Sequence, residues 1–160
     1  MRRGPGGGGG SALEAFEDKD RGVLAVRLHD GDDFIPSMLE ALDRAGLRYG
    51  AIVSGVGMLR DFEIGWLDTR THVYRKGTFA VPHELLSLSG SIAVTDDAEA
   101  KVMPHMHASL AGPDHSVVGG HLFKATTNVL NEVFVLRLDV PMKRRLNPAT
   151  GIMELTLPKM

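Results

Sequence analysis

The sequence predicts an α+β fold in which one main helix flanks an antiparallel β-sheet. One stretch, residues 34–45, carries apolar side chains at helical spacing. Most other apolar runs are short and strand-like, and turn signals recur at intervals of about 8–15 residues, which favours antiparallel pairing. Strands and helices do not alternate regularly along the chain, so a doubly wound sheet is not expected.

The first elements are a strand over residues 22–29 and the helix over residues 34–45. An acidic turn, residues 30–33, supplies aspartates that can cap the first turn of the helix. Pro36 falls in that first turn, where a missing N–H costs little. Gly46 follows the last apolar position and suits the C-cap.

Two strands are expected next, over residues 51–54 and 62–67, with a glycine-containing segment between them. A dinucleotide fingerprint needs three glycines that lead into a helix. This segment leads into another strand, so its glycines indicate a bend or a close backbone approach. A short strand over 71–74 and a turn over 75–77 follow.

The second half of the chain contains further strand-like segments joined by polar turns. In residues 84–94, strict alternation places Glu84 on the same face as Leu88 and Ile92. The other predicted strands cover residues 103–111, 116–123, 127–138 and 152–157.

Composition narrows the function classes. The 160 residues are expected to form one domain over residues 20–158, preceded by a flexible Gly-rich tail over residues 1–12. A net charge of −2 argues against a nucleic-acid binder with a basic face. No apolar run approaches the roughly 20 residues of a membrane span, and no secretory signal is recognisable. The absence of cysteine fits a cytoplasmic protein.

Three histidines form the main chemical motif. His105 and His107 are two residues apart in a predicted strand, so they share a face with Cβ atoms about 6–7 Å apart. A three- or five-residue loop centred on Asp114 would place His121 directly opposite His107. An even-numbered loop would send His121 to the other face, unless a bulge at Gly119-Gly120 restored the register.

Three converging imidazoles in a chain without thiols predict a metal site, with zinc as the expected ion and an open fourth position. That position could hold water or a small-molecule ligand. Glu84 and Glu132 are the candidate catalytic acid–base residues near such a site. Two simpler interpretations stay open. In one, Glu84 lies in water at the end of its strand; in the other, the histidines only form hydrogen bonds.

At this point the chain resembles the plants-and-prokaryotes conserved domain, called PPC or PCC. The resemblance extends over about residues 22–157. It rests on an ordered set of motifs: Gly31-Asp32 with the following helix, residues 54–57 with 60–61, residues 84–90, residues 104–112 and residues 118–122.

The resemblance implies an α+β fold that assembles as a homotrimer. In plants the domain is joined to AT-hook segments of nuclear DNA-binding proteins. Here Arg2-Arg3-Gly4-Pro5 matches such a segment only in part. The fold is also similar to that of acetolactate decarboxylase, a zinc enzyme with a three-histidine site. By that likeness, His105, His107 and His121 map onto metal ligands.

Three functions follow as hypotheses. The first is a trimeric metalloprotein with an open three-histidine site for a small carbonyl or carboxylate compound. The second is a DNA-binding or transcription-associated module, for which the basic cluster Lys143-Arg144-Arg145 is the local evidence. The third is a scaffold in which metal and trimer serve assembly alone.

Overall fold

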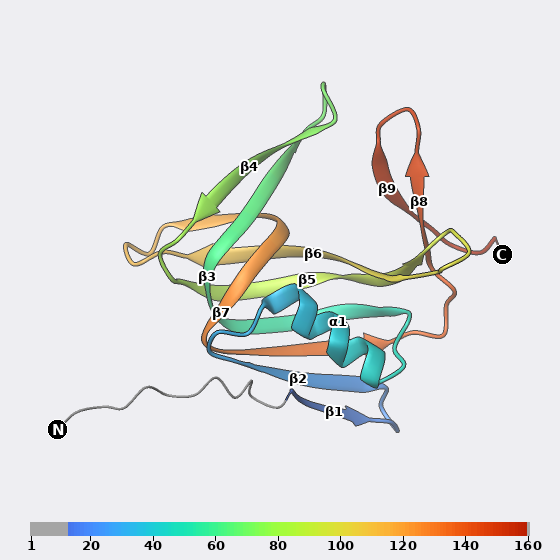
Figure 1. Ribbon diagram of the computed structural model, residues 1–160, viewed down its shortest axis with the longest axis horizontal. Helices are drawn as coiled ribbons and strands as arrows, with labels where there is room; N and C mark the ends of the chain where they lie inside the picture. Colours follow the sequence, from blue (N-terminus) through green and yellow to red (C-terminus); the bar gives the residue numbers. More distant parts are fainter. Residues whose placement is uncertain (1–12, 160) are drawn as a thin grey trace.

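The computed structural model describes residues 13–159, and it confirms an α+β fold with one helix on a mainly antiparallel sheet (Figure 1). The predicted Gly-rich tail, residues 1–12, lies outside the described residues. In chain order the elements are β1 (Glu14–Asp18), β2 (Val23–His29), α1 (Phe34–Arg44), β3 (Gly50–Asp68), β4 (Val73–Phe79), β5 (His83–Thr95), β6 (Val102–Ala111), β7 (Val117–Arg137), β8 (Lys143–Asn147) and β9 (Ile152–Thr156).

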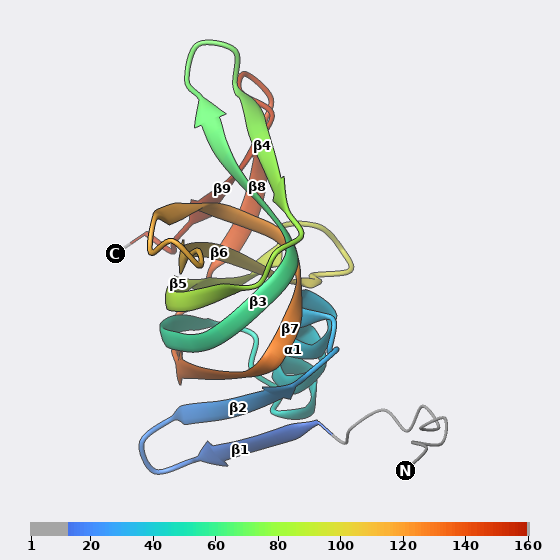
Figure 2. The same ribbon diagram turned by 90° about the vertical axis from the view of Figure 1, so that its left-hand side faces the viewer.

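Four strands close a ring at the centre of the molecule. β7 pairs with β3, β3 with β5, β5 with β6, and β6 again with β7, all antiparallel. The remaining strands extend this ring: β1 and β2 beside β7, β4 on β3, and the β8–β9 hairpin on β5. Figure 2 shows the β4 and β8–β9 hairpins rising from the same side of the ring, opposite β1 and β2.

The helix covers the part of the sheet formed by β2 and β7 (Figure 1). Its N-cap is Asp33, in extended conformation, although the carboxylate accepts no capping hydrogen bond. Gly46 follows the C-cap with φ 59, as predicted, and its N–H donates to the Asp43 carbonyl. The buried helical side chains share one face and pack on the core: Phe34, Met38, Ala41 and Leu42. No helix within residues 13–159 is long and apolar enough to cross a membrane.

The two predicted strands at 51–54 and 62–67 are parts of one long strand, β3. Several register shifts against β7 absorb the irregular segment between them, so the hydrogen-bond ladder continues through it. The glycines serve close approach, as predicted: a Cβ on Gly55 would lie 2.6 Å from the Leu88 Cβ. A Cβ on Gly57 would overlap the Leu130 carbonyl oxygen.

The predicted turn at residues 75–77 is wrong. These residues lie inside β4, where Gly77 pairs with Ile64, and the chain reverses at residues 69–72 instead. The Asp68 carboxylate accepts hydrogen bonds from the Arg70 N–H and from Arg75, and these bonds hold the reversal. Strand β1 was not predicted; it pairs with β2 over its full length.

The predicted faces of β5 also need correction. A bulge between Leu85 and Ser87 shifts the register against β6 and reverses the alternation. Leu85 is buried, whereas Leu86 is 51% exposed. Glu84 therefore points to solvent with Leu86, and it does not share a face with Leu88 and Ile92.

Candidate metal centre

The three histidines come from neighbouring strands of the ring. His105 and His107 lie on β6 and His121 on β7, and His107 pairs directly with His121. The register is regular from this pair to Ala111 opposite Val117, which leaves a five-residue loop centred on Asp114. The odd register predicted from the sequence is therefore confirmed.

Local hydrogen bonds in the loop fix this register. The Asp114 carboxylate accepts from the Ser116 N–H at 3.0 Å and from the Ser116 hydroxyl at 2.6 Å. The Gly112 N–H donates to the Ser116 carbonyl at 2.9 Å, and His115 takes a left-handed conformation with φ 64. Aspartate side chains often accept hydrogen bonds from the backbone two residues further along, and this contact stabilises a turn.

Gly119 and Gly120 have a different role from the bulge considered above. The β6–β7 pairing runs through both without a register shift. A Cβ on Gly120 would lie 2.6 Å from the Gly65 carbonyl oxygen of β3, and one on Gly119 would lie 3.0 Å from the Ala108 oxygen of β6. The glycines therefore let β7 pack tightly between β6 and β3 beside His121.

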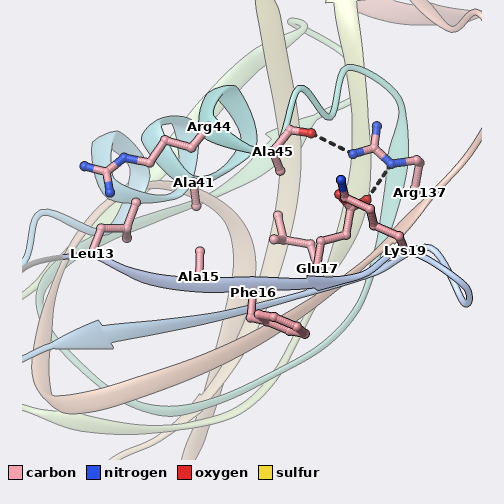
Figure 3. Close-up of a pocket in the computed structure, with 10 residues that line it drawn as sticks. Leu13, Ala15, Phe16, Glu17, Lys19, Ala41, Arg44, Ala45 and Arg137 are labelled. Atoms are coloured by element: carbon pink, nitrogen blue, oxygen red, sulfur yellow. Dashed lines mark hydrogen bonds and ion pairs between the residues drawn. The ribbon is translucent and has the colours of Figure 1, made fainter.

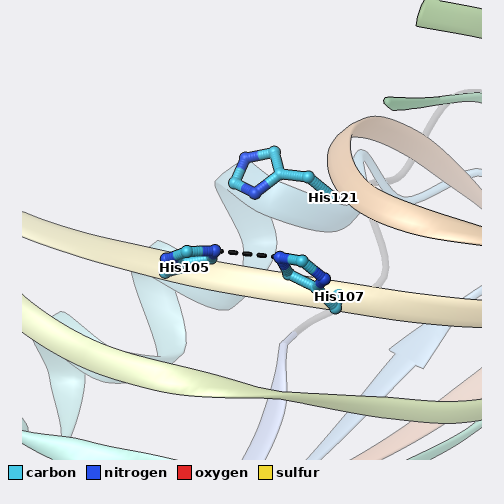
Figure 4. Close-up of side chains that lie close together, drawn as sticks. All are labelled: His105, His107 and His121. Carbon is cyan, nitrogen blue, oxygen red and sulfur yellow. Dashed lines mark hydrogen bonds between the residues drawn. The ribbon is translucent and has the colours of Figure 1, made fainter. Parts of the chain in front are cut away.

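The imidazoles converge on one point (Figure 4). The Nε2 atoms of His105 and His107 are 3.0 Å apart, and one ring nitrogen from each of the three residues lies within 4.8 Å of the others. A tetrahedral zinc ion with bonds of about 2.0–2.1 Å holds its ligand nitrogens about 3.3 Å apart. Within residues 13–159 this is the one such cluster of three potential ligands. Its spacing suits a single ion after small side-chain rotations.

The surroundings of His105 and His121 favour the neutral imidazole, the form that binds metal. Burial, with a smaller contribution from His105, His107, Lys76 and Arg144, lowers the pKa of His121 to about 4. Burial also lowers the pKa of His105, and the positive charge of Arg144 adds to that effect. The His121 Nδ1 atom is buried and finds no hydrogen-bond partner among the described residues.

Aromatic side chains hold the His121 ring from the side of β4 and β7. The Phe123 ring lies 4.6 Å from it and the Tyr74 ring 5.3 Å, measured between centroids. Lys76 places its Nζ 3.9 Å from the Phe123 centroid, in a cation–π contact. The ring of His121 is thus fixed by packing.

A cavity of about 290 Å³ opens beside the histidines. Its wall includes His105 and His121, together with residues of β4 and of the β8–β9 hairpin. Two further lining residues are polar, His72 and Arg144. The others are mostly apolar or aromatic: Tyr74, Met103, Pro104, Phe123, Gly151, Ile152 and Met153. None of the described residues that line it is acidic.

The sequence predicts Lys143-Arg144-Arg145 as a solvated basic cluster, and for Arg144 this prediction is wrong. It is 4% exposed, and its Nη2 donates to the Ser91 hydroxyl at 2.6 Å. Its neighbours Lys143 and Arg145 point away and pair with Asp96 at 2.7 and 2.6 Å. Alternation along a strand separates the three cations, a signal that the sequence already carried.

The two glutamates considered as acid–base residues lie away from the histidines in this chain. Glu84 is exposed and pairs with Ala111, at the opposite end of β6 from His105. Glu132 is exposed on β7 between Arg27 and Val56. Neither lines the cavity, so their catalytic role stays a prediction without support from the geometry of one chain.

The sequence predicts the other four histidines at the surface, because they lie at strand ends or turns: His29, His72, His83 and His115. His72 is exposed, as predicted, and it also lines the cavity. His83 is buried against Phe62 and Phe79, with ring centroids 5.0 and 5.6 Å away. The His83 Nδ1 lies 2.8 Å from the Val81 carbonyl oxygen. For His83 the surface expectation is wrong, because it begins a buried strand.

A second, larger cavity of about 660 Å³ lies between β1 and the end of α1 (Figure 3). One cation that lines this cavity, Arg137, has partners within the protein. Its Nε lies 2.6 Å from a Glu17 carboxylate oxygen, and its Nη2 donates to the Ala45 carbonyl at 2.8 Å. The pair ties β7 to β1 and to the helix terminus. We therefore interpret the Arg137–Glu17 ion pair as structural.

Comparison with known proteins agrees with this description. Residues 16–139 match the model of the Plants and Prokaryotes Conserved (PCC) domain. No curated protein matches the chain.

Solved structures extend the likeness over most of the chain. A metal-containing protein of Archaeoglobus fulgidus is 33% identical, with a TM-score of 0.76 over 91% of this chain and 99% of that one. A protein of Bacteroides thetaiotaomicron, whose description gives DNA binding as a proposed role, has a TM-score of 0.82 at 21% identity, over 91% and 97% of the two chains. A plant- and prokaryote-conserved protein of Pyrococcus horikoshii has a TM-score of 0.74 at 18% identity, over 94% and 96%.

Proposed function

This chain belongs to the Plants and Prokaryotes Conserved (PCC) domain family, and on that premise we propose that it is a metalloprotein whose His105, His107 and His121 bind one divalent ion, preferentially zinc. The observation that carries the proposal is the convergence of three ring nitrogens within 4.8 Å. Imidazole nitrogens without thiolates suit zinc and neighbouring transition metals, and tetrahedral coordination suits zinc best. The description of the Archaeoglobus relative as metal-containing supports the same conclusion.

Three protein ligands leave a fourth position, as in catalytic zinc sites. A zinc ion there would supply Lewis acidity and activate a bound water. The protein contributes the cavity wall: His105 and His121 line the cavity, so the open position would face a small-molecule ligand. The cysteine-free sequence supports the predicted cytoplasmic location.

Assembly as a homotrimer is part of the proposal. Its support is an apolar row across β1, β2 and β7, in which the exposed Phe16 and Phe134 flank the half-buried Ala25 as cross-strand neighbours. Phe16 is 76% exposed in the single chain. Apolar rows of this kind usually mark an interface. A trimer mass in light scattering is expected, and a monomer at micromolar concentration would contradict it.

DNA binding is the second candidate, because the Bacteroides neighbour is described in that way. The charge distribution of this chain gives it less support, since Lys143 and Arg145 pair with Asp96 and Arg144 is buried. A metal-stabilised trimeric scaffold without a ligand is the third. An electrophoretic shift assay at physiological salt separates the DNA role: tight binding that weakens steeply with added salt would favour it.

The metal proposal is tested by zinc analysis of protein purified without added metal and after zinc titration. We expect about one tightly bound ion per chain in the wild type and strong loss in His107→Ala, because two ligands hold zinc far less well than three. The matched control is His115→Asn, on the nearby β6–β7 loop, where asparagine tolerates the left-handed backbone. Equal zinc content in wild type and His107→Ala would overturn the proposal.

A further inference from the structure

Arg144 is a buried cation without a counter-ion among residues 13–159. It is 4% exposed, and no carboxylate among residues 13–159 lies within 4.0 Å of its guanidinium. Its one side-chain partner is the neutral Ser91 hydroxyl, and its Nε is buried without a partner among the described residues. Buried guanidinium groups are normally paired with anions, because desolvating an uncompensated charge is costly.

This cation lies at the proposed metal centre. Arg144 lines the same cavity as His105 and His121, and Ser91, its hydroxyl partner, pairs in the sheet with His105. The position follows from topology: β8 pairs in parallel with β5, which places Arg144 beside Thr95. A hairpin distant in sequence therefore delivers one positive charge to the three-histidine site.

The charges of the site are unbalanced once an ion binds. Three neutral imidazoles leave both charges of a divalent ion uncompensated, and Arg144 adds a third positive charge. The part of the chain that the structure describes contributes no aspartate or glutamate to the cavity lining. An anionic ligand would offset part of this positive charge.

We infer that the cavity binds a small monocarboxylate, with its carboxylate at Arg144 and an oxygen of the neighbouring carbon at the open metal position. A 2-oxo or 2-hydroxy acid has both groups at this spacing. The inference rests on the proposed metal site and names the ligand class for it.

Size and lining support this class. A volume of about 290 Å³ is at the lower limit of ligand cavities, which suits an acid of a few carbons. Met103, Ile152 and Met153 offer an apolar wall for a short alkyl group. A planar guanidinium matches a carboxylate, whereas phosphate sites usually gather several donors, and here one cation is present.

A purely structural role for Arg144, tying β8 to β5 through Ser91, is the competing reading. The two readings differ in what they predict for ligands. A structural arginine would leave the binding of a carboxylate unchanged in a folded variant, whereas an anion-binding arginine would not.

The test uses full-length, zinc-loaded protein and isothermal titration with pyruvate, with pyruvamide as its uncharged analogue. Pyruvate is expected to bind at least about tenfold more tightly than pyruvamide. Arg144→Gln is expected to weaken pyruvate binding by at least about tenfold and to leave pyruvamide unchanged. The matched control is Arg145→Gln, which removes the same charge from the next, 64% exposed position of β8 and is expected to change pyruvate binding less than about twofold.

Each outcome decides the inference. Equal binding of pyruvate and pyruvamide by the wild type overturns it without any variant, so a poorly folded Arg144→Gln does not obscure the result. Arg144→Lys, which keeps the charge but loses the planar fork, is expected to fall between wild type and Arg144→Gln. If zinc analysis shows a loaded site but these differences are absent, the carboxylate inference alone fails; if the wild type takes up no zinc, both proposals fail.

Discussion

Acid should destabilise the metal-free protein through His121. Burial and neighbouring positive groups lower the pKa of this side chain from 6.5 to about 4 in the folded state. Between these two values the unfolded chain binds a proton that the folded chain does not, so a falling pH favours unfolding. The stabilisation from neutral His121 is complete above pH 6.5 and is lost progressively as the pH falls to about 4.

The size of the loss follows from the shift. For a fully desolvated group, a shift of this size corresponds to about 3.4 kcal/mol in the free energy of unfolding. His121 is only half-buried, and solvent screens part of the interaction. We expect about 1.5–2 kcal/mol to be lost between pH 7 and pH 4 because of this residue.

Urea unfolding of chelator-treated protein at a series of pH values measures this loss. His121→Gln keeps a polar side chain that does not titrate, so its free energy of unfolding should fall by about 1.5–2 kcal/mol less than that of the wild type over the same range. The control His115→Asn should follow the wild-type slope. The reasoning is refuted if His121→Gln and the wild type lose stability in parallel.

Two further predictions concern the scaffold. Gly90→Ala should destabilise the fold by at least about 2 kcal/mol, because a Cβ there would overlap the His105 carbonyl oxygen. The control Gly77→Ala should cost less than about 1 kcal/mol, because its Cβ would lie 3.2 Å from the edge of the Phe79 ring. Similar urea midpoints for the two variants would contradict this prediction. Arg137→Met should cost about 2 kcal/mol in urea unfolding, because it leaves Glu17 largely buried without its partner. Adding Glu17→Gln should recover part of that loss, and a double variant no more stable than Arg137→Met would show that the pair is not the cause.

Local patterns were enough to predict the helix and the histidine register. The helix rests on one apolar stripe and a terminal glycine, both of which act within a few residues. His107 lies opposite His121 because the loop is centred on Asp114. In a regular hairpin the residue numbers of each pair add up to the same total, so the centre of the loop determines every pair. Such features depend on short segments, so the local sequence is enough to predict them.

Other features depend on partners distant in sequence. The bulge between Leu85 and Ser87 reverses the faces of β5, and nothing within strict alternation signals it. The single strand β3 continues through an irregular segment because β7 and β5 support it on either side. Arg144 looked like part of a surface cluster, because its burial arises only when β8 pairs in parallel with β5.

The site therefore has two parts with different origins. The histidines lie in the closed ring of β3, β5, β6 and β7, inside the segment that matches the family model, residues 16–139. Arg144, Ile152 and Met153 belong to the β8–β9 hairpin, beyond the end of that segment. A rigid ring suits an ion, because it fixes ligand nitrogens to within the few tenths of an ångström that coordination requires. In the proposed site the peripheral hairpin would supply charge and shape for the ligand, so chains that share the ring but differ in this hairpin would differ in what they bind at the open position.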